Sequence, residues 1–353
     1  MSTELAAVAK AMVAPGKGIL AADESTGTAN KRFAPLNIPQ TEDMRRAYRD
    51  MLFTLPDFGT FFSGVILYDE TIRQQGLQST SFVQVLQGAH SFPGIKLDTG
   101  AHPLALANDN EKITEGLDGL AARVDEYVKM GAKFAKWRAV ITIDERNGLP
   151  SDDCLHANAH ALARYAAICQ AGGLVPIVEP EVISDGDLAT QSMETSFAVH
   201  ERALLAVFEE LAIANVRLED MVLKPSMVVP GQKSGRSAPV RDVAEATVTV
   251  LMRRVPAAVA GIAFLSGGQS DEDATAHLNE INKVAAERNV PWPLTFSYGR
   301  ALQHAALNIW KGDAANVTAA QAAMHHRAKM NSLAAQGKWS PDLENEKELA
   351  LSR

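Results

Sequence analysis

Three lysines lie inside short, otherwise apolar segments of the chain, at Lys96, Lys136 and Lys224. Lysine is rarely buried unless a partner or a chemical role keeps it there. A lysine beside a second ammonium group, in a partly desolvated cavity, has a lowered pKa and attacks a ketone as the free amine to form a Schiff base. If Lys136 and Lys224 are neighbours, we expect such a lowered pKa. The lysines therefore predict amine-based covalent chemistry.

Carboxylates end or follow similar apolar segments, at Asp23, Glu179 and Glu181. Cleavage of a carbon–carbon bond beside an iminium needs an acid/base group, which these side chains supply. Each carboxylate is also explained as an ion-pair partner of the lysines. The two explanations are compatible, because a carboxylate paired with a lysine cluster is also placed to move a proton.

Two glycine-containing loops indicate a phosphate site. Ser266-Gly267-Gly268 follows one apolar segment, and Ser297 ends the next one, directly before Tyr298-Gly299-Arg300. Glycine lets a ligand approach the backbone N–H groups closely, and an arginine adds a permanent positive charge.

A second anion site is predicted from Ser25, Thr28 and Arg32, together with Lys96. Two phosphate sites on either side of an amine cluster indicate a bisphosphorylated sugar as the substrate. Alternation places Arg138 on the same face of its segment as Lys136, so Arg138 is expected beside the cluster.

Eight short apolar segments have the length and composition of parallel strands buried on both faces. They cover residues 18–23, 64–69, 94–98, 134–140, 174–180, 221–226, 261–267 and 293–299. Amphipathic helices are expected between them, including 116–130, 152–171, 195–212, 240–254 and 271–288. Ser151 and Ser270 precede two of these helices as N-caps.

This alternation predicts an α/β fold with one (β/α)8 TIM barrel, and an open doubly wound sheet is the second choice. We expect a single domain over residues 1–353, with an N-terminal helical extension. The barrel core covers about 18–310, and a C-terminal helix and mobile tail cover about 311–353. Catalytic groups of such barrels lie at the C-terminal ends of the strands, where the polar residues named above fall, together with Asp69.

Charge, apolar segments and motifs argue against several classes of function. The formal net charge of −8 argues against a nucleic-acid binder, and no segment reaches the roughly 18 apolar residues of a membrane span. Cys154 and Cys169 lie too far apart on one expected helix to form a disulfide, which favours a cytoplasmic location. His156 and His160 lack the glutamate of a zincin motif, and no G-x-G-x-x-G opens a helix, so we predict no metal and no cofactor.

Six segments together resemble class I fructose-1,6-bisphosphate aldolases, which work without a metal. They are GILAADEST at 18–26, FAKWR at 134–138, VPIVEPE at 175–181, LKP at 223–225, FLSGGQS at 264–270 and LTFSYGRALQ at 294–303. The resemblance covers about residues 4–340. It implies reversible cleavage of fructose 1,6-bisphosphate to dihydroxyacetone phosphate and glyceraldehyde 3-phosphate, and a homotetramer.

The resemblance also implies a role for each site residue. Lys224 would form the Schiff base, with Glu179 as acid/base for carbinolamine dehydration, and Asp23, Lys136 and Glu181 would act at the cleaved bond. The implied C1-phosphate ligands are Ser266, Gly267, Gly299 and Arg300, and the implied C6-phosphate ligands are Ser25, Thr28 and Lys96. Arg32 and Arg138 would line the site.

Two other functions stay open at this stage. One is a sugar-phosphate-binding scaffold without catalysis, although the four groups that catalysis needs most, Asp23, Lys136, Glu179 and Lys224, are all present. The other is a Schiff-base aldolase for a different ketose phosphate, because a few pocket side chains read the stereochemistry of the hydroxyl groups.

The chain departs from the family at its end. The best-known members end in a tyrosine that helps to move the proton on the enamine carbon, whereas this chain ends Leu351-Ser352-Arg353. We predict that deleting the residues after Gly337 costs less activity than tail loss usually does in the family. Steady-state kinetics test this, and a collapse of turnover with intact substrate binding would contradict it.

Overall fold

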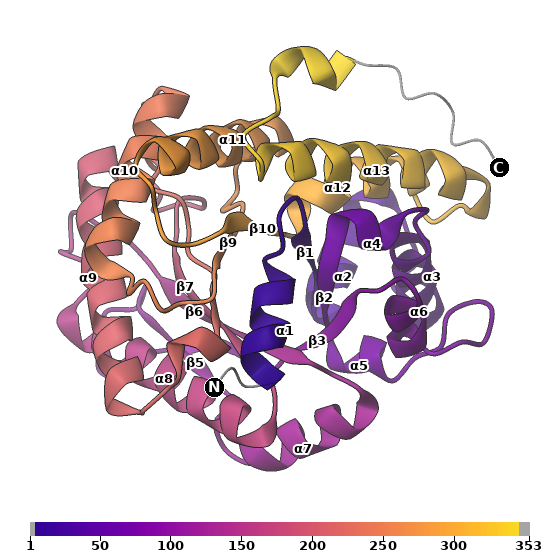
Figure 1. The fold of residues 1–353 in the computed structure, drawn as a ribbon, viewed down its shortest axis with the longest axis horizontal. Helices are drawn as coiled ribbons and strands as arrows, with labels where there is room; N and C mark the ends of the chain where they lie inside the picture. The colour runs from indigo at the N-terminus through magenta and orange to yellow at the C-terminus, as the bar shows by residue number, and fades with distance from the viewer. Residues whose placement is uncertain (1–3, 346–353) are drawn as a thin grey trace.

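Eight parallel strands close into a barrel in the computed structural model, which describes residues 4–345. Around the barrel the strands follow chain order (Figure 1). They are β1 (Gly18–Ala22), β2 (Phe62–Leu67), β3 (Phe92–Lys96), β6 (Phe134–Ile141), β7 (Val175–Val182), β8 (Val222–Leu223), β9 (Ile262–Phe264) and β10 (Leu294–Tyr298). The predicted barrel is confirmed, and closure between β1 and β10 rules out the open sheet.

Thirteen α-helices are present in the described residues, and most of them surround the barrel (Figure 1). They are α1 (Glu4–Met12), α2 (Thr26–Phe33), α3 (Glu42–Phe53), α4 (Phe58–Phe61), α5 (Asp69–Ile72), α6 (Phe82–Gly88), α7 (Leu120–Met130), α8 (Asp152–Gly172), α9 (Met193–Ile213), α10 (Val240–Arg254), α11 (Asp271–Glu287), α12 (Arg300–Trp310) and α13 (Val317–Ala334). Short 3-10 turns are η1 (Ala34–Leu36), η2 (Leu218–Asp220), η3 (Ala314–Asn316) and η4 (Pro341–Asn345).

The helix starts follow local capping chemistry. The hydroxyls of Ser151 and Ser270 accept hydrogen bonds from backbone N–H groups three residues later, at 3.1 and 3.0 Å, so both predicted N-caps are confirmed. The helix expected from Gly116 begins later, at Leu120. Gly116 and Gly119 have φ of +119° and +65°, which end the extended backbone and delay the helix.

Large and small residues alternate inside the barrel. Phe134 fills the interior beside Gly94, its partner on β3, and Gly64 on β2. A Cβ on Gly94 would lie 2.2 Å from the Phe134 ring, so only glycine leaves room for it. Ala9 and Met12 of α1 pack into the same cluster. The predicted N-terminal helical extension is confirmed, and it covers the N-terminal end of the barrel.

A hairpin that the sequence did not indicate is inserted between β3 and β6. It consists of β4 (Gly100–Pro103) and β5 (Lys112–Glu115), paired antiparallel. Thr114 donates a hydrogen bond of 2.7 Å to the carbonyl oxygen of Arg138, which ties the hairpin to the mouth of the barrel.

Residues 338–345 do not form the mobile tail that is expected after Gly337. Glu344 of η4 accepts hydrogen bonds from His326, Arg327 and Trp339 at 2.8, 2.5 and 2.9 Å, so residues 341–345 are docked on α13. The remainder, including the terminal Leu351-Ser352-Arg353, lies outside the described residues. A C-terminal deletion that does not expose the buried Arg327 must therefore start after Asn345.

No helix between residues 4 and 345 combines the length and the apolar character needed to span a membrane.

The packing of Phe134 predicts the outcome of two glycine substitutions. Gly94→Ala places a methyl group against the aromatic ring and should destabilise the fold by about 1–3 kcal/mol, the usual cost of overpacking. Gly88→Ala, at the end of α6, has no atom within 4 Å of the added Cβ and should cost nothing. Urea unfolding compares the stabilities of the two variants. Equal stabilities would contradict the close packing of Phe134 against Gly94.

Candidate active site

A cavity of about 260 Å³ lies at the C-terminal ends of the barrel strands. Six basic and four acidic side chains line it, so it favours anions in a chain whose net charge is −8. Fifteen of the sixteen residues that the sequence predicts for the site line this cavity: Asp23, Ser25, Thr28, Arg32, Lys96, Lys136, Arg138, Glu179, Glu181, Lys224, Ser266, Gly267, Ser297, Gly299 and Arg300. Ala21, Glu24 and Leu265 complete the lining.

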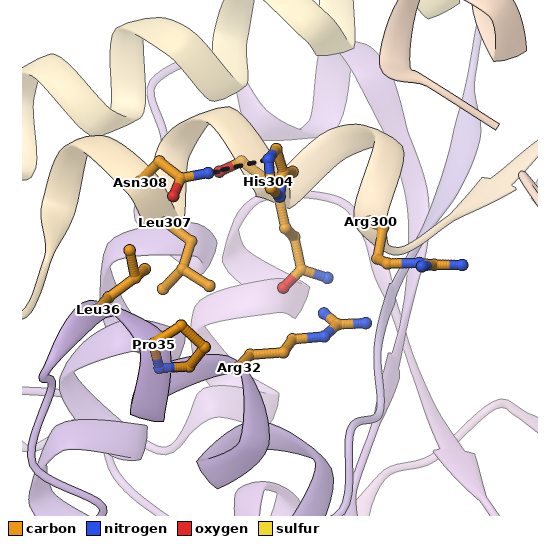
Figure 2. Close-up of a pocket in the computed structure, with 8 residues that line it drawn as sticks. Arg32, Pro35, Leu36, Arg300, His304, Leu307 and Asn308 are labelled. Atoms are coloured by element: carbon orange, nitrogen blue, oxygen red, sulfur yellow. Dashed lines mark hydrogen bonds between the residues drawn. The ribbon is translucent and has the colours of Figure 1, made fainter. Parts of the chain in front are cut away.

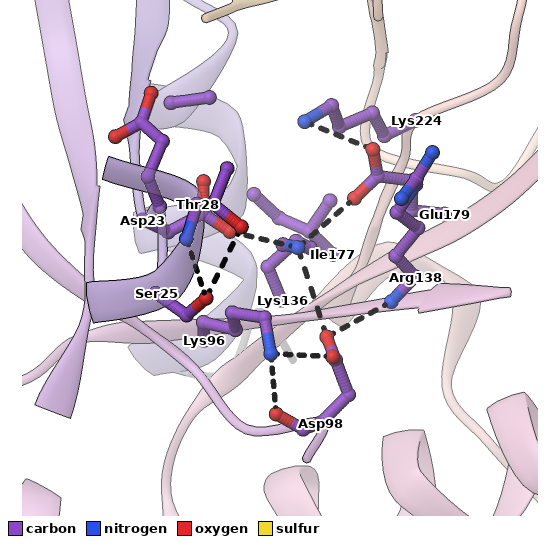
Figure 3. Close-up of polar contacts among 12 residues, drawn as sticks. Asp23, Ser25, Thr28, Lys96, Asp98, Lys136, Arg138, Ile177, Glu179 and Lys224 are labelled. Atoms are coloured by element: carbon purple, nitrogen blue, oxygen red, sulfur yellow. Dashed lines mark hydrogen bonds and ion pairs between the residues drawn. The ribbon is translucent and has the colours of Figure 1, made fainter. Parts of the chain in front are cut away.

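Glu179, which lines the cavity, lies between two buried lysines (Figure 3). Its Oε1 is 3.1 Å from Nζ of Lys224, and its Oε2 is 3.5 Å from Nζ of Lys136. The side chains of Glu179 and both lysines are each 4–5% exposed. The expected proximity of Lys136 and Lys224 is thus confirmed, with a carboxylate between them.

Three carboxylates surround Lys136. Asp23, Glu179 and Asp98 lie 2.8, 3.5 and 3.7 Å from its Nζ. Burial alone would lower the pKa of Lys136, but these three negative charges outweigh it and raise the pKa well above its usual range. The lowered pKa expected from a lysine pair is therefore wrong for Lys136, which carries its charge at neutral pH.

Asp23 is the counterpart of Lys136. Burial alone would raise the pKa of the Asp23 carboxyl, but Lys136, and then Lys224 and Lys96, pull it well below its usual range. Both members of the pair are charged at neutral pH. Glu181 pairs in turn with Arg138, whose position in β6 is directly opposite Glu179 in β7.

One end of the cavity has free backbone donors. Gly267 has a φ of +54°, which places the chain in the left-handed region that favours glycine. Among the described residues, no acceptor hydrogen-bonds to the N–H group of Gly267 or of Gly268. The hydroxyl of Ser297 is buried there and likewise has no partner in the described part of the chain. Gly299 precedes α12, so the N-terminus of that helix also faces this end.

Arg300 and Gly268, at the same end of the cavity, both contact Asp185. Nη2 of Arg300 is 2.7 Å from Oδ2 of Asp185. Gly268 is the one predicted site residue that does not line the cavity, and it packs against Asp185 instead.

The opposite end is built from the start of α2 and the end of β3. Ser25 caps α2, and its hydroxyl lies 3.1 Å from that of Thr28. Nζ of Lys96 lies 2.5 Å from Oδ1 of Asp98. Two hydroxyls and one ammonium group are suitable ligands for a phosphate.

Sequence reasoning missed two buried acids. Glu24 pairs with Arg32 and, at 2.6 Å, with Arg49. Asp98 pairs with both Lys96 and Lys136. A signal existed for each, since Glu24 directly follows Asp23 and the third apolar segment ends at Asp98. Nothing in the sequence indicated Arg49, which lies in the middle of α3.

A second, more apolar cavity of about 220 Å³ adjoins the first one (Figure 2). Pro35, Leu36 and Leu307 line it, and it shares Arg32 and Arg300 with the active-site cavity. The two arginines thus lie at the boundary between both cavities.

Other candidate groups lie elsewhere. Asp69 begins α5 and pairs with Arg73 at 2.8 Å, away from the lining of the cavity. His156 and His160 of α8 lie against Glu210 of α9, at 3.4 and 2.9 Å. Within residues 4–345, no group of three or more His, Cys, Asp or Glu side chains has an arrangement that could hold a metal ion.

Comparison with known proteins shows the family to which this barrel and its lysine-containing cavity belong. A family model described as "Fructose-bisphosphate aldolase class-I" matches residues 4–351. The chain belongs to the class-I fructose-bisphosphate aldolase family. A relative from Xanthomonas campestris pv. campestris, named "Probable fructose-bisphosphate aldolase class 1", is 53% identical over 337 residues, which are 95% of this chain and 98% of the relative. The protein named "Fructose-bisphosphate aldolase 4, cytosolic" from Arabidopsis thaliana is 49% identical, over 96% of this chain and 84% of its own.

A solved structure of the same family has the same fold. The fructose-bisphosphate aldolase from Plasmodium falciparum, determined in complex with TRAP and a small-molecule inhibitor, superposes with a TM-score of 0.92 at 46% identity. The match covers 96% of this chain and 95% of the other. The expected family is confirmed, and the chain is a class I fructose-bisphosphate aldolase by its family and its named relatives, which makes it a lyase.

The Asp23–Lys136 pair predicts a pH-dependent stability. The lowered pKa of Asp23 stabilises the fold above the usual value of 3.8, and this contribution is lost as the pH falls below it. Asp23→Asn removes the nearest partner of a buried ammonium group, so we expect a loss of about 3 kcal/mol at pH 7. The variant should also lose less stability than the wild type between pH 5 and pH 3.

Urea unfolding at several pH values measures both effects. Asp152→Asn is the matched control, because Asp152 is 97% exposed and pairs with Arg202 on the surface, so its loss should change little. Equal effects of the two substitutions would contradict the buried pair.

Proposed function

We propose that the chain cleaves fructose 1,6-bisphosphate without a metal, through a Schiff base on Lys224. The observation that carries this proposal is the place of Glu179, whose two oxygens lie 3.1 Å from Lys224 and 3.5 Å from Lys136. A nucleophilic amine needs a base beside it, and Glu179 is within reach of the Lys224 amine to serve as that base. Lys136, held charged by its carboxylates, supplies a fixed positive charge next to the reacting carbon atoms.

Schiff-base formation has two steps. The Lys224 amine attacks the C2 ketone to give a carbinolamine, and the hydroxyl then leaves as water with a proton from Glu179. The product is a protonated iminium, which accepts the electron pair of the C3–C4 bond. Loss of the proton from the C4 hydroxyl, with Asp23, Lys136 and Glu181 acting at this bond, releases glyceraldehyde 3-phosphate. The remaining enamine is protonated at C3, and water hydrolyses the iminium to dihydroxyacetone phosphate.

The two ends of the cavity would bind the two phosphates. Ser266, Gly267, Gly299 and Arg300, with Ser297 and Gly268 beside them, would hold the C1 phosphate. Ser25, Thr28 and Lys96 would hold the C6 phosphate, with Arg32 and Arg138 lining the site. The unpaired N–H groups and the net positive lining of the cavity support this assignment.

We further propose that residues 1–353 form one catalytic domain, that the enzyme assembles as a homotetramer and that it serves glycolysis and gluconeogenesis in the cytoplasm. Support for the location comes from the relative named as cytosolic, and from the two buried free cysteines. The tetramer rests on the family resemblance.

The deciding experiment is chemical trapping. Incubation with dihydroxyacetone phosphate and borohydride, in the presence of EDTA, should reduce the iminium to a stable amine on Lys224, which peptide mapping locates. Lys224→Arg should give no adduct, because guanidinium is not a nucleophile at neutral pH. Absence of an adduct from the wild type, or loss of activity in EDTA, would overturn the metal-free mechanism.

Lys136→Met is the matched lysine control. It should still give an adduct on Lys224, since Lys136 contributes charge and not the nucleophile, while cleavage of fructose 1,6-bisphosphate falls at least about 100-fold, as for loss of a positioned charged group. An adduct that maps to Lys136 in the wild type would reverse the two roles.

A further inference from the structure

Two adjacent residues outside the cavity contact both parts of the proposed C1-phosphate site, the Gly267–Gly268 loop and Arg300. Ser184 and Asp185 follow β7, the strand that carries Glu179 and Glu181. The Ser184 hydroxyl, buried at 6% exposure, donates a hydrogen bond of 2.8 Å to the carbonyl oxygen of Gly267. The Asp185 carboxylate binds the Arg300 guanidinium at 2.7 Å. We call this pair the Ser184–Asp185 bridge.

The bridge also fits closely against the glycine loop. Gly268 has a φ of +77°, and a Cβ there would lie 2.6 Å from Oδ2 of Asp185 and 2.7 Å from its Cβ. Gln232, from the loop after β8, donates a hydrogen bond from its Nε2 to the carbonyl oxygen of Gly268. The absence of a side chain at Gly268 is therefore what lets Asp185 pack against the loop.

These contacts fix the direction of the backbone donors. A trans peptide unit points its C=O and its N–H in opposite directions. Because the Gly267 carbonyl points to Ser184, the N–H group of Gly268 points away from Ser184. Without the serine hydroxyl, this peptide unit loses the one hydrogen bond to its carbonyl oxygen in the described part of the chain, and a glycine on either side gives little resistance to rotation.

The Asp185–Arg300 pair acts on orientation more than on stability. The Arg300 side chain is 54% exposed and that of Asp185 is 33% exposed, and such pairs contribute little to the free energy of folding. Asp185 occupies one Nη2 donor of Arg300, and no other group in the described part of the chain binds the remaining donors of the guanidinium. A long side chain held in this way loses less conformational freedom when it binds an anion.

We propose that Ser184 and Asp185 are positioning residues for the phosphate next to the reacting ketone. Ser184 fixes the amide donors of the Gly267–Gly268 loop, and Asp185 holds Arg300 at the cavity. The inference deepens the proposed function and rests on its assignment of this end of the cavity to the C1 phosphate. It also connects phosphate binding to β7, so the same segment sets the position of the acid/base Glu179 and of the phosphate ligands.

The first test removes the Ser184 hydroxyl. Ser184→Ala should raise the Kd for dihydroxyacetone phosphate, measured by calorimetry, by about two- to tenfold, the range expected for one lost hydrogen bond. The KM for fructose 1-phosphate should rise by a similar factor, with kcat within about twofold of the wild type. Ser184→Thr retains the hydroxyl and should restore most of the affinity.

Ser63→Ala is the matched control. The Ser63 hydroxyl is also buried and donates to backbone carbonyls, those of Met12 and Gly18 at 2.5 and 3.0 Å, but at the N-terminal end of the barrel. It should lower stability without changing the Kd. Equal Kd values for Ser184→Ala and the wild type, or equal increases for Ser184→Ala and Ser63→Ala, would overturn the role of Ser184.

The second test is a double-mutant cycle for Asp185. Asp185→Asn should raise the Kd for dihydroxyacetone phosphate about two- to fivefold in the wild type, and should have no effect in the Arg300→Ala background, because its action passes through Arg300. A lower Kd in Asp185→Asn, or the same factor in both backgrounds, would overturn its role.

Trapping with borohydride separates this inference from the proposed function. If the wild type binds dihydroxyacetone phosphate but forms no Lys224 adduct, the Schiff-base mechanism fails while the comparison of Kd values still tests the bridge. If all variants form the adduct and their Kd values do not differ, the bridge fails and the mechanism stands.

Discussion

The structure depends on how buried charge is compensated at the mouth of the barrel. An ammonium group without a partner in a protein interior costs several kcal/mol or loses its proton. Lys136 avoids both outcomes because β1, β6 and β7, with the loop after β3, bring Asp23, Glu179 and Asp98 within 3.7 Å of it. These groups come from segments far apart in the chain. They meet, and compensate one another's charge, only when the barrel has closed.

The same constraint separates two lysines that look alike in the sequence. Within residues 4–345, Lys136 has three carboxylate neighbours, whereas Lys224 forms an ion pair with Glu179 alone. A group surrounded by fixed charges supplies an electric field, and a group with a single, shared acid partner is better placed to exchange a proton. The two residues are of the same type, so their different surroundings determine that Lys136 supplies the charge and Lys224 exchanges the proton.

Much of this arrangement follows from the sequence. The apolar segments predicted all eight strands, because strands buried on both faces leave a nearly continuous hydrophobic pattern. The polar residues at their ends predicted most of the cavity lining, because parallel strands in a barrel bring their C-terminal ends to one face. Ser151 and Ser270 predicted helix starts, since capping is a local interaction.

The rest depends on contacts between distant segments. The sequence did not predict the surplus of carboxylates that raises the pKa of Lys136, because that surplus arises only where acids from three separate segments, among them Asp98, meet around one ammonium group. The same holds for Arg49 beside Glu24, and for Ser184 beneath Gly267. The β4–β5 hairpin was missed because its residues, among them His102, Pro103 and Lys112, are mostly exposed and carry no apolar pattern.

The helix that covers the bottom of the barrel has a consequence for synthesis of the protein. Ala9 and Met12 leave the ribosome well before the rest of the cluster that buries them, which includes Val222 and Ala263, made about 210 and 250 residues later. At typical translation rates this delay is on the order of tens of seconds. During that time the apolar face of α1 has no complete binding surface, so nascent chains of this enzyme expose a hydrophobic helix that chaperones can recognise.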